Sequence, residues 1–283
     1  MDGSPTGMNY LTAKGARMPA IGFGTWSLRG WRGRRAIGRA LGLGYRHIDT
    51  AQLYENETDV GRALHSSGVD RGEIFLVTKL RRENLRADAV RCSTDDSLRQ
   101  LGTDYVDLLM IHWPNGAVPL AETLEAMSRL REIGKARFIG VCNFTTKLLV
   151  EAVERCGADL LCNQVEYHPF LSQIYVRDAA RRLGMIVVAY SPLARGFVER
   201  DPTMCAIAAK YNKTPAQIAL RWLIGQDNVA AIPKARSAAH AAANLAVFDF
   251  TLAAEDRAAI DRLGQSRNRI QEREPDMPEW DPA

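Results

Sequence analysis

The stretch Ile74–Leu101, IFLVTKLRRENLRADAVRCSTDDSLRQL, contains both halves of one structural unit. It opens with a short, mostly apolar run, IFLVTK at 74–79, and continues with a segment of helical period at 87–101. A β-rich run followed by a helical segment is the sequence pattern of a βα unit. Seven further runs of this kind occur: AIGFG (20–24), YRHID (45–49), DLLMIHW (107–113), ARFIGVC (136–142), LCNQVEY (161–167), MIVVAYS (185–191) and VAAIP (229–233).

A segment with helical period follows each run. The expected helices are Arg34–Leu43, Glu57–Ser66, Ala87–Leu101, Leu120–Ile133, Thr146–Cys156, Ile174–Leu183, Pro202–Ile224 (in one piece or two) and Ala238–Val247. The runs start roughly 25–40 residues apart, which is the length of a βα unit and of the crossover that joins parallel strands. Eight such units predict an α/β protein with a closed (β/α)8 barrel, a TIM barrel, that occupies residues 1–283 as one domain.

The two ends of the chain add to this barrel. Met8–Pro19 is expected to form an N-terminal hairpin that closes the bottom of the barrel. Glu255–Leu263 is expected to form one extra helix, and residues 264–283, which contain three prolines, a C-terminal tail. No linker rich in proline, glycine or serine interrupts the series of units, and this favours a single domain.

Composition narrows the classes of function. The 283 residues carry a net charge of +4, and acidic and basic residues are interspersed. This arrangement predicts no nucleic-acid partner and no membrane partner. The five cysteines, which lack C-x-x-C spacing, predict reduced and buried thiols in a cytoplasmic protein. The first ten residues, MDGSPTGMNY, lack the features of a signal peptide. We expect a monomer whose partner is a small molecule.

Polar residues at the predicted strand ends are the candidates for chemistry, because the active site of such a barrel lies at the C-terminal ends of its strands. Asp49, Lys79 and His112 each follow an apolar run, and Tyr54 lies in the loop after Asp49. An ammonium beside a tyrosine favours the phenolate, so Lys79 is expected to lower the pKa of Tyr54. Asp49 would keep Lys79 charged, and a neutral His112 could orient a carbonyl oxygen.

Each of these residues also has a simpler interpretation. Taken singly, Asp49 is more often a helix N-cap or a turn residue, and Lys79 is more often a solvated loop residue or a Schiff-base lysine. His112 alone is more often a hydrogen-bonded structural residue. The convergence of four such residues on one barrel mouth favours the catalytic interpretation. His47 is expected to be structural.

The sequence also resembles the aldo-keto reductase family, in its branch of bacterial 2,5-diketo-D-gluconate reductases. The resemblance extends from about residue 18 to 281 and depends on GFGTW, GYRHIDTAQLYENETDVGRAL, IFLVTKL, DLLMIHWP, IGVCNF, NQVEYHP, VAYSPLARG and the IPKA region. It implies a (β/α)8 barrel with NAD(P)H across its mouth. The family's catalytic tetrad falls on Asp49, Tyr54, Lys79 and His112, with Tyr54 as the proton donor in carbonyl reduction.

The resemblance also implies the cofactor contacts. Asn143 and Gln164 would hold the nicotinamide carboxamide, Tyr190 would stack on its ring, and the loop 191–196 would border the pyrophosphate. The full set is Gly24, Thr25, Trp26, Asp49, Asn143, Gln164, Tyr190, Ser191, Pro192, Leu193, Gly196, Ile232, Pro233, Lys234, Arg236, His240 and Asn244. Cys142 stands where the family commonly has serine, and a thiol donates weakly.

The chain carries no strand–GxGxxG–helix unit, so a Rossmann site is not expected. Instead, Lys234 and Arg236 would bind the 2′-phosphate of NADPH, and Asn244 would contact the adenine. Ala235 and His240 replace the family's serine and arginine, so NADH is a possible alternative cofactor. Tyr54, His112 and three tryptophans, Trp26, Trp113 and Trp280, would border the substrate. No metal is expected.

The predicted function is therefore an NADP-dependent reductase that transfers hydride to small aldehydes, ketones or keto-sugars. Two alternatives remain at this stage. The first is a Schiff-base aldolase that uses Lys79 on the same fold. The second is a cofactor-binding regulatory or structural barrel with little turnover, since a barrel fold does not establish activity.

Overall fold

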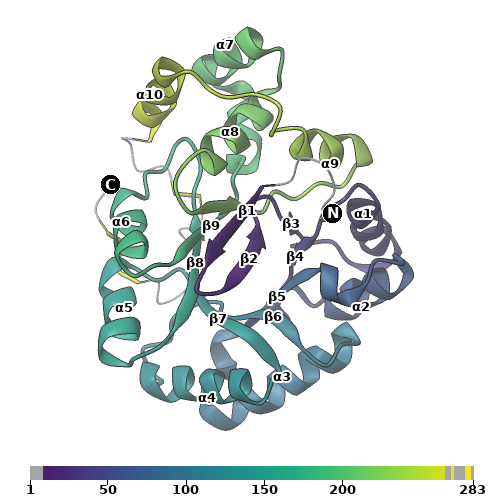
Figure 1. The fold of residues 1–283 in the computed structure, drawn as a ribbon, viewed down its shortest axis with the longest axis vertical. Helices are drawn as coiled ribbons and strands as arrows, with labels where there is room; N and C mark the ends of the chain where they lie inside the picture. The colour runs from purple at the N-terminus through teal and green to yellow at the C-terminus, as the bar shows by residue number, and fades with distance from the viewer. Residues whose placement is uncertain (1–8, 265–268, 271–277, 282–283) are drawn as a thin grey trace.

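The computed structural model describes residues 9–264, 269–270 and 278–281. Eight parallel strands form one sheet in sequential order (Figure 1). They are β3 (Phe23–Gly24), β4 (His47–Asp49), β5 (Phe75–Leu80), β6 (Val106–Ile111), β7 (Ala136–Cys142), β8 (Leu160–Glu166), β9 (Ile186–Tyr190) and β10 (Val229–Ala231). Ile21, just before β3, forms a parallel bridge with Ala231 of β10, so the two edges of the sheet meet. The predicted (β/α)8 barrel is confirmed.

Helices surround the strands (Figure 1). They are α1 (Gly30–Gly42), α2 (Glu57–Ser66), α3 (Ala87–Leu101), α4 (Leu120–Glu132), α5 (Thr146–Val150), α6 (Ile174–Arg182), α7 (Pro202–Tyr211), α8 (Pro215–Ile224), α9 (Ala238–Leu245) and α10 (Ala254–Leu263). Shorter turns are η1 (Gln52–Tyr54), η2 (Arg71–Glu73), η3 (Arg82–Asn84), η5 (Ala194–Arg200) and the π-helical η4 (Glu151–Arg155), which continues α5. All the predicted helices are present, with ends that differ by a few residues.

The segment Pro202–Ile224 forms two helices because its middle contains both a stop and a start signal. Asn212 ends α7 in the left-handed conformation, with φ of 52°. Thr214 then caps α8: its hydroxyl accepts from the backbone N–H of Gln217, whose side chain accepts from the N–H of Thr214. Pro215 occupies the first position of α8, where its missing N–H costs nothing.

The predicted N-terminal hairpin is confirmed as β1 (Tyr10–Ala13) and β2 (Ala16–Pro19), which pair antiparallel. Lys14 and Gly15 both have positive φ, as a two-residue hairpin turn requires. In Figure 1 the hairpin crosses in front of the ring of strands. Ala16 and Met18 of β2 are buried against side chains from β5, β6 and the other strands inside the barrel, so the hairpin closes one end.

The apolar residues of the strands divide into two cores with a period of two. Alternate strand residues pack inside the barrel, where they include Phe75, Val77, Leu108, Met110, Ile186 and Val188. The residues between them pack against the surrounding helices and include Leu76, Leu109, Val187 and Ala189. This alternation follows from the geometry of a β-strand, in which successive side chains point to opposite faces.

Candidate active site

The polar site residues continue the inward-facing series at one end of the barrel. Lys79 follows Phe75 and Val77 at spacing two, and His112 follows Leu108 and Met110 in the same way. Gln164 follows Cys162, and Tyr190 follows Val188. The parallel register pairs Asp49 with Val77 and Lys79 with Met110, so these side chains lie at neighbouring heights. The strand period and the register together bring the predicted residues to one barrel end.

Asp49 and Lys79 form a buried ion pair at the base of this site. Their side chains are 1% and 0% exposed, and Lys79 Nζ lies 2.5 Å from Asp49 Oδ1. Lys79 Nζ also donates to the carbonyl of Thr50 at 2.8 Å and to Tyr54 Oη at 3.5 Å. Burial acts to lower the pKa of Lys79, but the charge and hydrogen bond of Asp49, with further contributions from Tyr54 and Cys142, act in the opposite direction and together raise the pKa. Lys79 is therefore an ammonium with all three of its N–H donors engaged.

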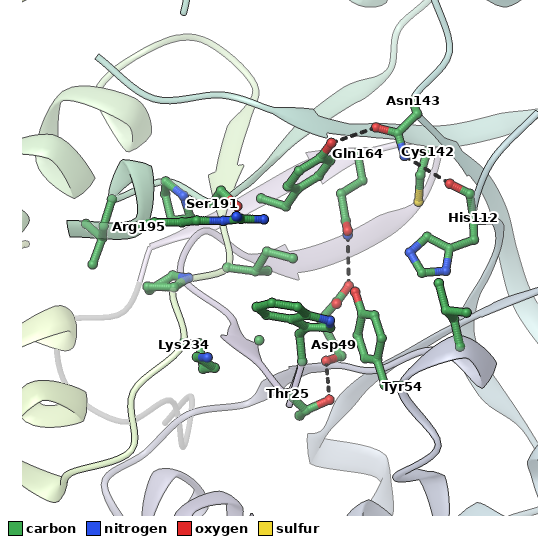
Figure 2. A pocket seen from close by; sticks show the side chains of 18 of the residues that line it. Thr25, Asp49, Tyr54, His112, Cys142, Asn143, Gln164, Ser191, Arg195 and Lys234 are labelled. Atoms are coloured by element: carbon green, nitrogen blue, oxygen red, sulfur yellow. Dashed lines mark hydrogen bonds between the residues drawn. The ribbon is translucent and has the colours of Figure 1, made fainter. Parts of the chain in front are cut away.

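The bonds of Asp49 argue against its interpretation as a helix cap. Its second carboxylate oxygen accepts from the amide of Gln164 at 2.8 Å (Figure 2). The following turn η1 has no side-chain cap, and its N-cap residue is Ala51. Asp49 thus joins Lys79 on one side to Gln164 on the other. The interpretation of Lys79 as a solvated residue is also wrong, because its side chain is fully buried.

Tyr54 ends the turn η1, which carries its ring over the ion pair. The ring lies edge-on to His112, with 5.5 Å between the ring centroids. Burial raises the pKa of Tyr54 to about 12, although the Lys79 ammonium acts in the opposite direction. The expected net lowering of this pKa is therefore wrong, because the loss of hydration outweighs the nearby charge. Tyr54 remains a protonated phenol at neutral pH.

His112 faces Tyr54 across the site (Figure 2). Burial, with the charges of Lys79 and Arg81, holds the pKa of His112 well below its usual range, so the ring is neutral near pH 7. Its Nδ1 is buried and has no hydrogen-bond partner within the described part of the chain. A neutral imidazole carries one N–H donor, as the sequence predicted for His112.

Amide and aromatic groups lie next to the tetrad. Tyr190 Oη donates to Asn143 Oδ1 at 2.9 Å, and Asn143 Nδ2 donates to the carbonyl of His112 at 3.0 Å (Figure 2). Cys142 lies beside them, buried, with its thiol 3.9 Å from the sulfur of Met110. All five cysteines are free, as predicted, but Cys92 and Cys205 are exposed and Cys156 is partly buried, so the expectation of buried thiols is wrong for these three. Cys92 and Cys205 lie on helices, where a side chain can point outward.

A cleft of about 540 Å³ opens over these residues. Its lining contains most of the predicted contact residues: Gly24, Thr25, Trp26, Asp49, Tyr54, His112, Trp113, Asn143, Gln164, Tyr190, Ser191, Pro192, Leu193, Gly196, Ile232, Pro233 and Lys234. It also contains Cys142, Leu53 and Arg195. Leu53 and Arg195 were missed, although their positions inside the Tyr54 loop and the 191–196 loop could have indicated them.

The cleft has a cationic end opposite the tetrad (Figure 2). Lys234 Nζ donates to Ser27 Oγ at 3.0 Å and lies 5.1 Å from the centre of the Trp26 ring. The guanidinium of Arg195 lies 5.9 Å from the same ring. Burial and the neighbouring charges of Arg236 and Arg195 lower the pKa of Lys234. Two cations from different loops therefore meet at a tryptophan that is 55% exposed.

Four predicted contact residues lie in the described part of the chain but outside the lining of the cleft. Arg236 and His240 are exposed, and Asn244 is buried in α9. Trp280 contacts Trp113 edge-on, with ring centroids 6.3 Å apart, and so lies next to the lining. The rest of the tail, at 265–268, 271–277 and 282–283, lies outside the described residues.

His47 has the structural position that was predicted for it. Its Nδ1 lies 3.3 Å from the carbonyl of Pro19 at the hairpin end of the barrel. Among the described residues, no group of three or more histidine, cysteine, aspartate or glutamate side chains is arranged to hold a metal ion. None of the helices in the described ranges combines the length and hydrophobicity needed to cross a membrane.

Comparisons with known proteins agree with this geometry. A sequence model of the Aldo/keto reductase family matches residues 20–265. Methylglyoxal reductase DkgB of Salmonella typhimurium is 40% identical over 93% of this chain and 99% of its own. A crystal structure of a candidate 2,5-diketo-D-gluconic acid reductase B superposes with a TM-score of 0.94, at 44% identity over 97% of this chain and 98% of that one. A Bombyx mori aldo-keto reductase in complex with NADP has a TM-score of 0.85, at 33% identity over 92% and 94% of the two chains.

Proposed function

Because the chain belongs to the aldo/keto reductase family, we propose that it is an NADPH-dependent reductase of small aldehydes, ketones or keto-sugars. The observation that carries the proposal is the contact of Lys79 with both Asp49 and Tyr54 beneath the cleft. We propose that residues 1–283 form one catalytic barrel domain.

Tyr54 is the proton donor in this proposal. Because Lys79 donates to Tyr54 Oη, the hydroxyl proton of Tyr54 is directed away from the ammonium, and Tyr54 lines the cleft. The raised pKa keeps this proton on the phenol until a carbonyl oxygen gains negative charge beside it. Lys79 then stabilises the phenolate that remains, and Asp49 keeps Lys79 charged.

His112 orients the substrate oxygen. Its Nδ1 is buried without a partner among the described residues, so we infer that the single ring proton lies on Nε2. A neutral N–H donor beside Tyr54 can hold the carbonyl oxygen against the phenol without competing for its proton. The two residues together fix the oxygen, which leaves the carbonyl carbon open for reduction.

The two ends of the cleft fit a nicotinamide dinucleotide. Asn143, Gln164 and Tyr190 offer amide and aromatic groups beside the tetrad, and Arg195 and Lys234 offer positive charge at the opposite end. When bound, NADPH would supply the hydride that reduces the carbonyl carbon. Gln164 donates to Asp49, and this bond fixes the position of the Gln164 side chain. Lys234 is the proposed partner of the 2′-phosphate, with Arg236 near it.

The alternative as a Schiff-base aldolase is not favoured. A Schiff base requires a neutral, accessible amine, whereas the raised pKa of Lys79 keeps it charged. Lys79 is also fully buried, and its three N–H groups are engaged. A cofactor-binding barrel without turnover remains the second outcome of the test.

The test measures oxidation of NADPH with methylglyoxal, simple ketones and keto-sugars. Tyr54→Phe is expected to lower kcat by about 100-fold or more while the Kd for NADPH changes less than twofold, because the phenol acts on the proton and not on the nucleotide. Binding of NADPH without turnover by the unmodified protein would favour a regulatory barrel. A borohydride-trapped adduct on Lys79 would favour the aldolase.

A further inference from the structure

We propose that Glu55 is a positioning residue, which acts by joining Arg29 and Arg81 across the turn that carries Tyr54. We call these three residues the Glu55 bracket. The inference rests on the proposed role of Tyr54 as proton donor. None of the three residues lines the cleft. The charge of Arg81 also helps to lower the pKa of His112, so the experiment varies Glu55, which directly follows Tyr54 in the chain.

The contacts of the bracket enclose the turn from both sides. Arg29, in the loop after β3, has its NH2 nitrogen 3.2 Å from Glu55 Oε2, and its Nε donates to the carbonyl of Tyr54 at 2.9 Å. Arg81, directly after β5, has its NH2 nitrogen 3.1 Å from Glu55 Oε1 and 2.9 Å from the carbonyl of Gln52. Each arginine therefore holds both the carboxylate and a backbone oxygen of the turn.

The backbone of the turn needs such support. Glu55 has φ of 52°, in the left-handed region that a residue with a side chain enters at a cost. It directly follows Tyr54, so a change in its conformation would move the ring. Strained residues of this kind persist only where their surroundings hold them, and they gather at functional sites. On the solvent side, Arg29 and Arg81 are the residues that hold Glu55 in this conformation.

Stability alone does not account for the bracket. The side chain of Glu55 is 58% exposed and that of Arg29 is 56% exposed. Ion pairs with this exposure contribute little to the stability of a fold, because water and salt screen them. Catalysis is more sensitive, because a displacement of about 1 Å at a reacting group can cost about 100-fold in rate. The bracket is placed to affect kcat more than folding.

The first arm of the experiment compares Glu55→Gln with Glu83→Gln. Glu83 lies in η3, two residues after Arg81, and is exposed, so this variant removes the same charge from the same rim. Glu55→Gln is expected to lower kcat about tenfold with KM and the Kd for NADPH within twofold, and Glu83→Gln to leave all three unchanged. Equal kcat in the two variants would overturn the proposal.

The second arm separates positioning from strain. Glu55→Gly removes the carboxylate but suits a positive φ, so its Tm should not fall while its kcat drops as in Glu55→Gln. Glu55→Asp, which keeps the charge on a shorter side chain, should recover part of the rate. A Glu55→Gly variant with full kcat would show that the backbone conformation suffices without the bracket.

The third arm does not depend on turnover. The N–H of Tyr54 donates to the carbonyl of Ala51 at 3.0 Å, and that of Glu55 to Gln52 at 3.2 Å. Hydrogen exchange of these two amides should accelerate in Glu55→Gln and not in Glu83→Gln. If the unmodified protein reduces no carbonyl, the proposed function is wrong. The bracket can still be tested in that case, because unchanged hydrogen exchange in Glu55→Gln would overturn it independently of turnover. Faster exchange with unchanged kcat in an active enzyme also overturns it.

Discussion

At the scale of single residues, the site depends on a charge that burial alone would remove. Lys79 is fully buried, and burial by itself lowers the pKa of an ammonium. Asp49, with smaller contributions from Tyr54 and Cys142, reverses that effect, and Asp49 is in turn held by Gln164. Tyr54 shows the opposite balance, because burial raises its pKa to about 12 despite Lys79. Burial thus keeps Tyr54 protonated at neutral pH, whereas the neighbouring carboxylate of Asp49 helps keep Lys79 charged.

The cationic end of the cleft gives a prediction on cofactor choice. Lys234→Ala combined with Arg236→Ala should raise the Kd for NADPH by roughly 10- to 100-fold and that for NADH by much less. A charged hydrogen bond to the 2′-phosphate contributes about 1.5–3 kcal/mol, and NADH lacks this phosphate. Titration of both dinucleotides by fluorescence measures the difference. Arg257→Ala on the exposed face of α10 is the control, and equal losses for both dinucleotides would contradict the assignment.

At the scale of elements, the two ends of the strands have different roles. The end with the tetrad leads into loops that hold left-handed non-glycine residues, among them Ser27, Glu55, Asn143, Ser191 and Arg195. The opposite end is closed by the hairpin and by ion pairs at the strand starts. Strain therefore accumulates on the side of the cleft, as expected for a functional site.

Asp107, at the start of β6, should be important for stability and not for chemistry. It is buried and accepts from Arg71 at 2.8 Å, from the backbone N–H of Leu76 at 2.9 Å and from Arg137 at 3.2 Å. Asp107→Asn should lower the free energy of unfolding by about 2–4 kcal/mol, because it leaves these donors without a charged acceptor. Urea denaturation measures the loss. Asp104→Asn, at a nearby exposed position, should change little, and equal losses would contradict this role.

At the scale of the whole molecule, the barrel interior keeps two histidines neutral, one near each end. Burial lowers the pKa of His47 and, with nearby cations, that of His112. For a histidine with a depressed pKa, the stabilisation is present above its unfolded value near 6.5 and is lost as pH falls below it. Acid should therefore weaken the fold, by up to about 1.4 kcal/mol per pH unit for each histidine.

Urea denaturation between pH 7.5 and 5.5 measures this effect. His112→Gln should reduce the slope of stability against pH relative to the unmodified protein, and His240→Gln, at an exposed position, should not. Comparing slopes isolates His112, because Glu57, whose pKa burial raises, contributes with the opposite sign in both proteins. An unchanged slope in His112→Gln would contradict a neutral buried imidazole.

Signals in the sequence were enough to predict the eight βα units, the hairpin and the convergence of Asp49, Tyr54, Lys79 and His112 on one barrel end, but they left open whether Pro202–Ile224 forms one helix or two. These are local or periodic signals: strand and helix periods, caps, and polar residues at strand ends. Three features became visible only in the folded chain: the raised pKa of Tyr54, the bond from Gln164 to Asp49, and the entry of Arg195 into the cleft. The same is true of the Glu55 bracket, in which Arg29 precedes Glu55 by 26 residues and Arg81 follows it by 26. Desolvation and contacts between distant loops depend on the closed barrel, because only closure fixes how deeply a group is buried and which charges it meets.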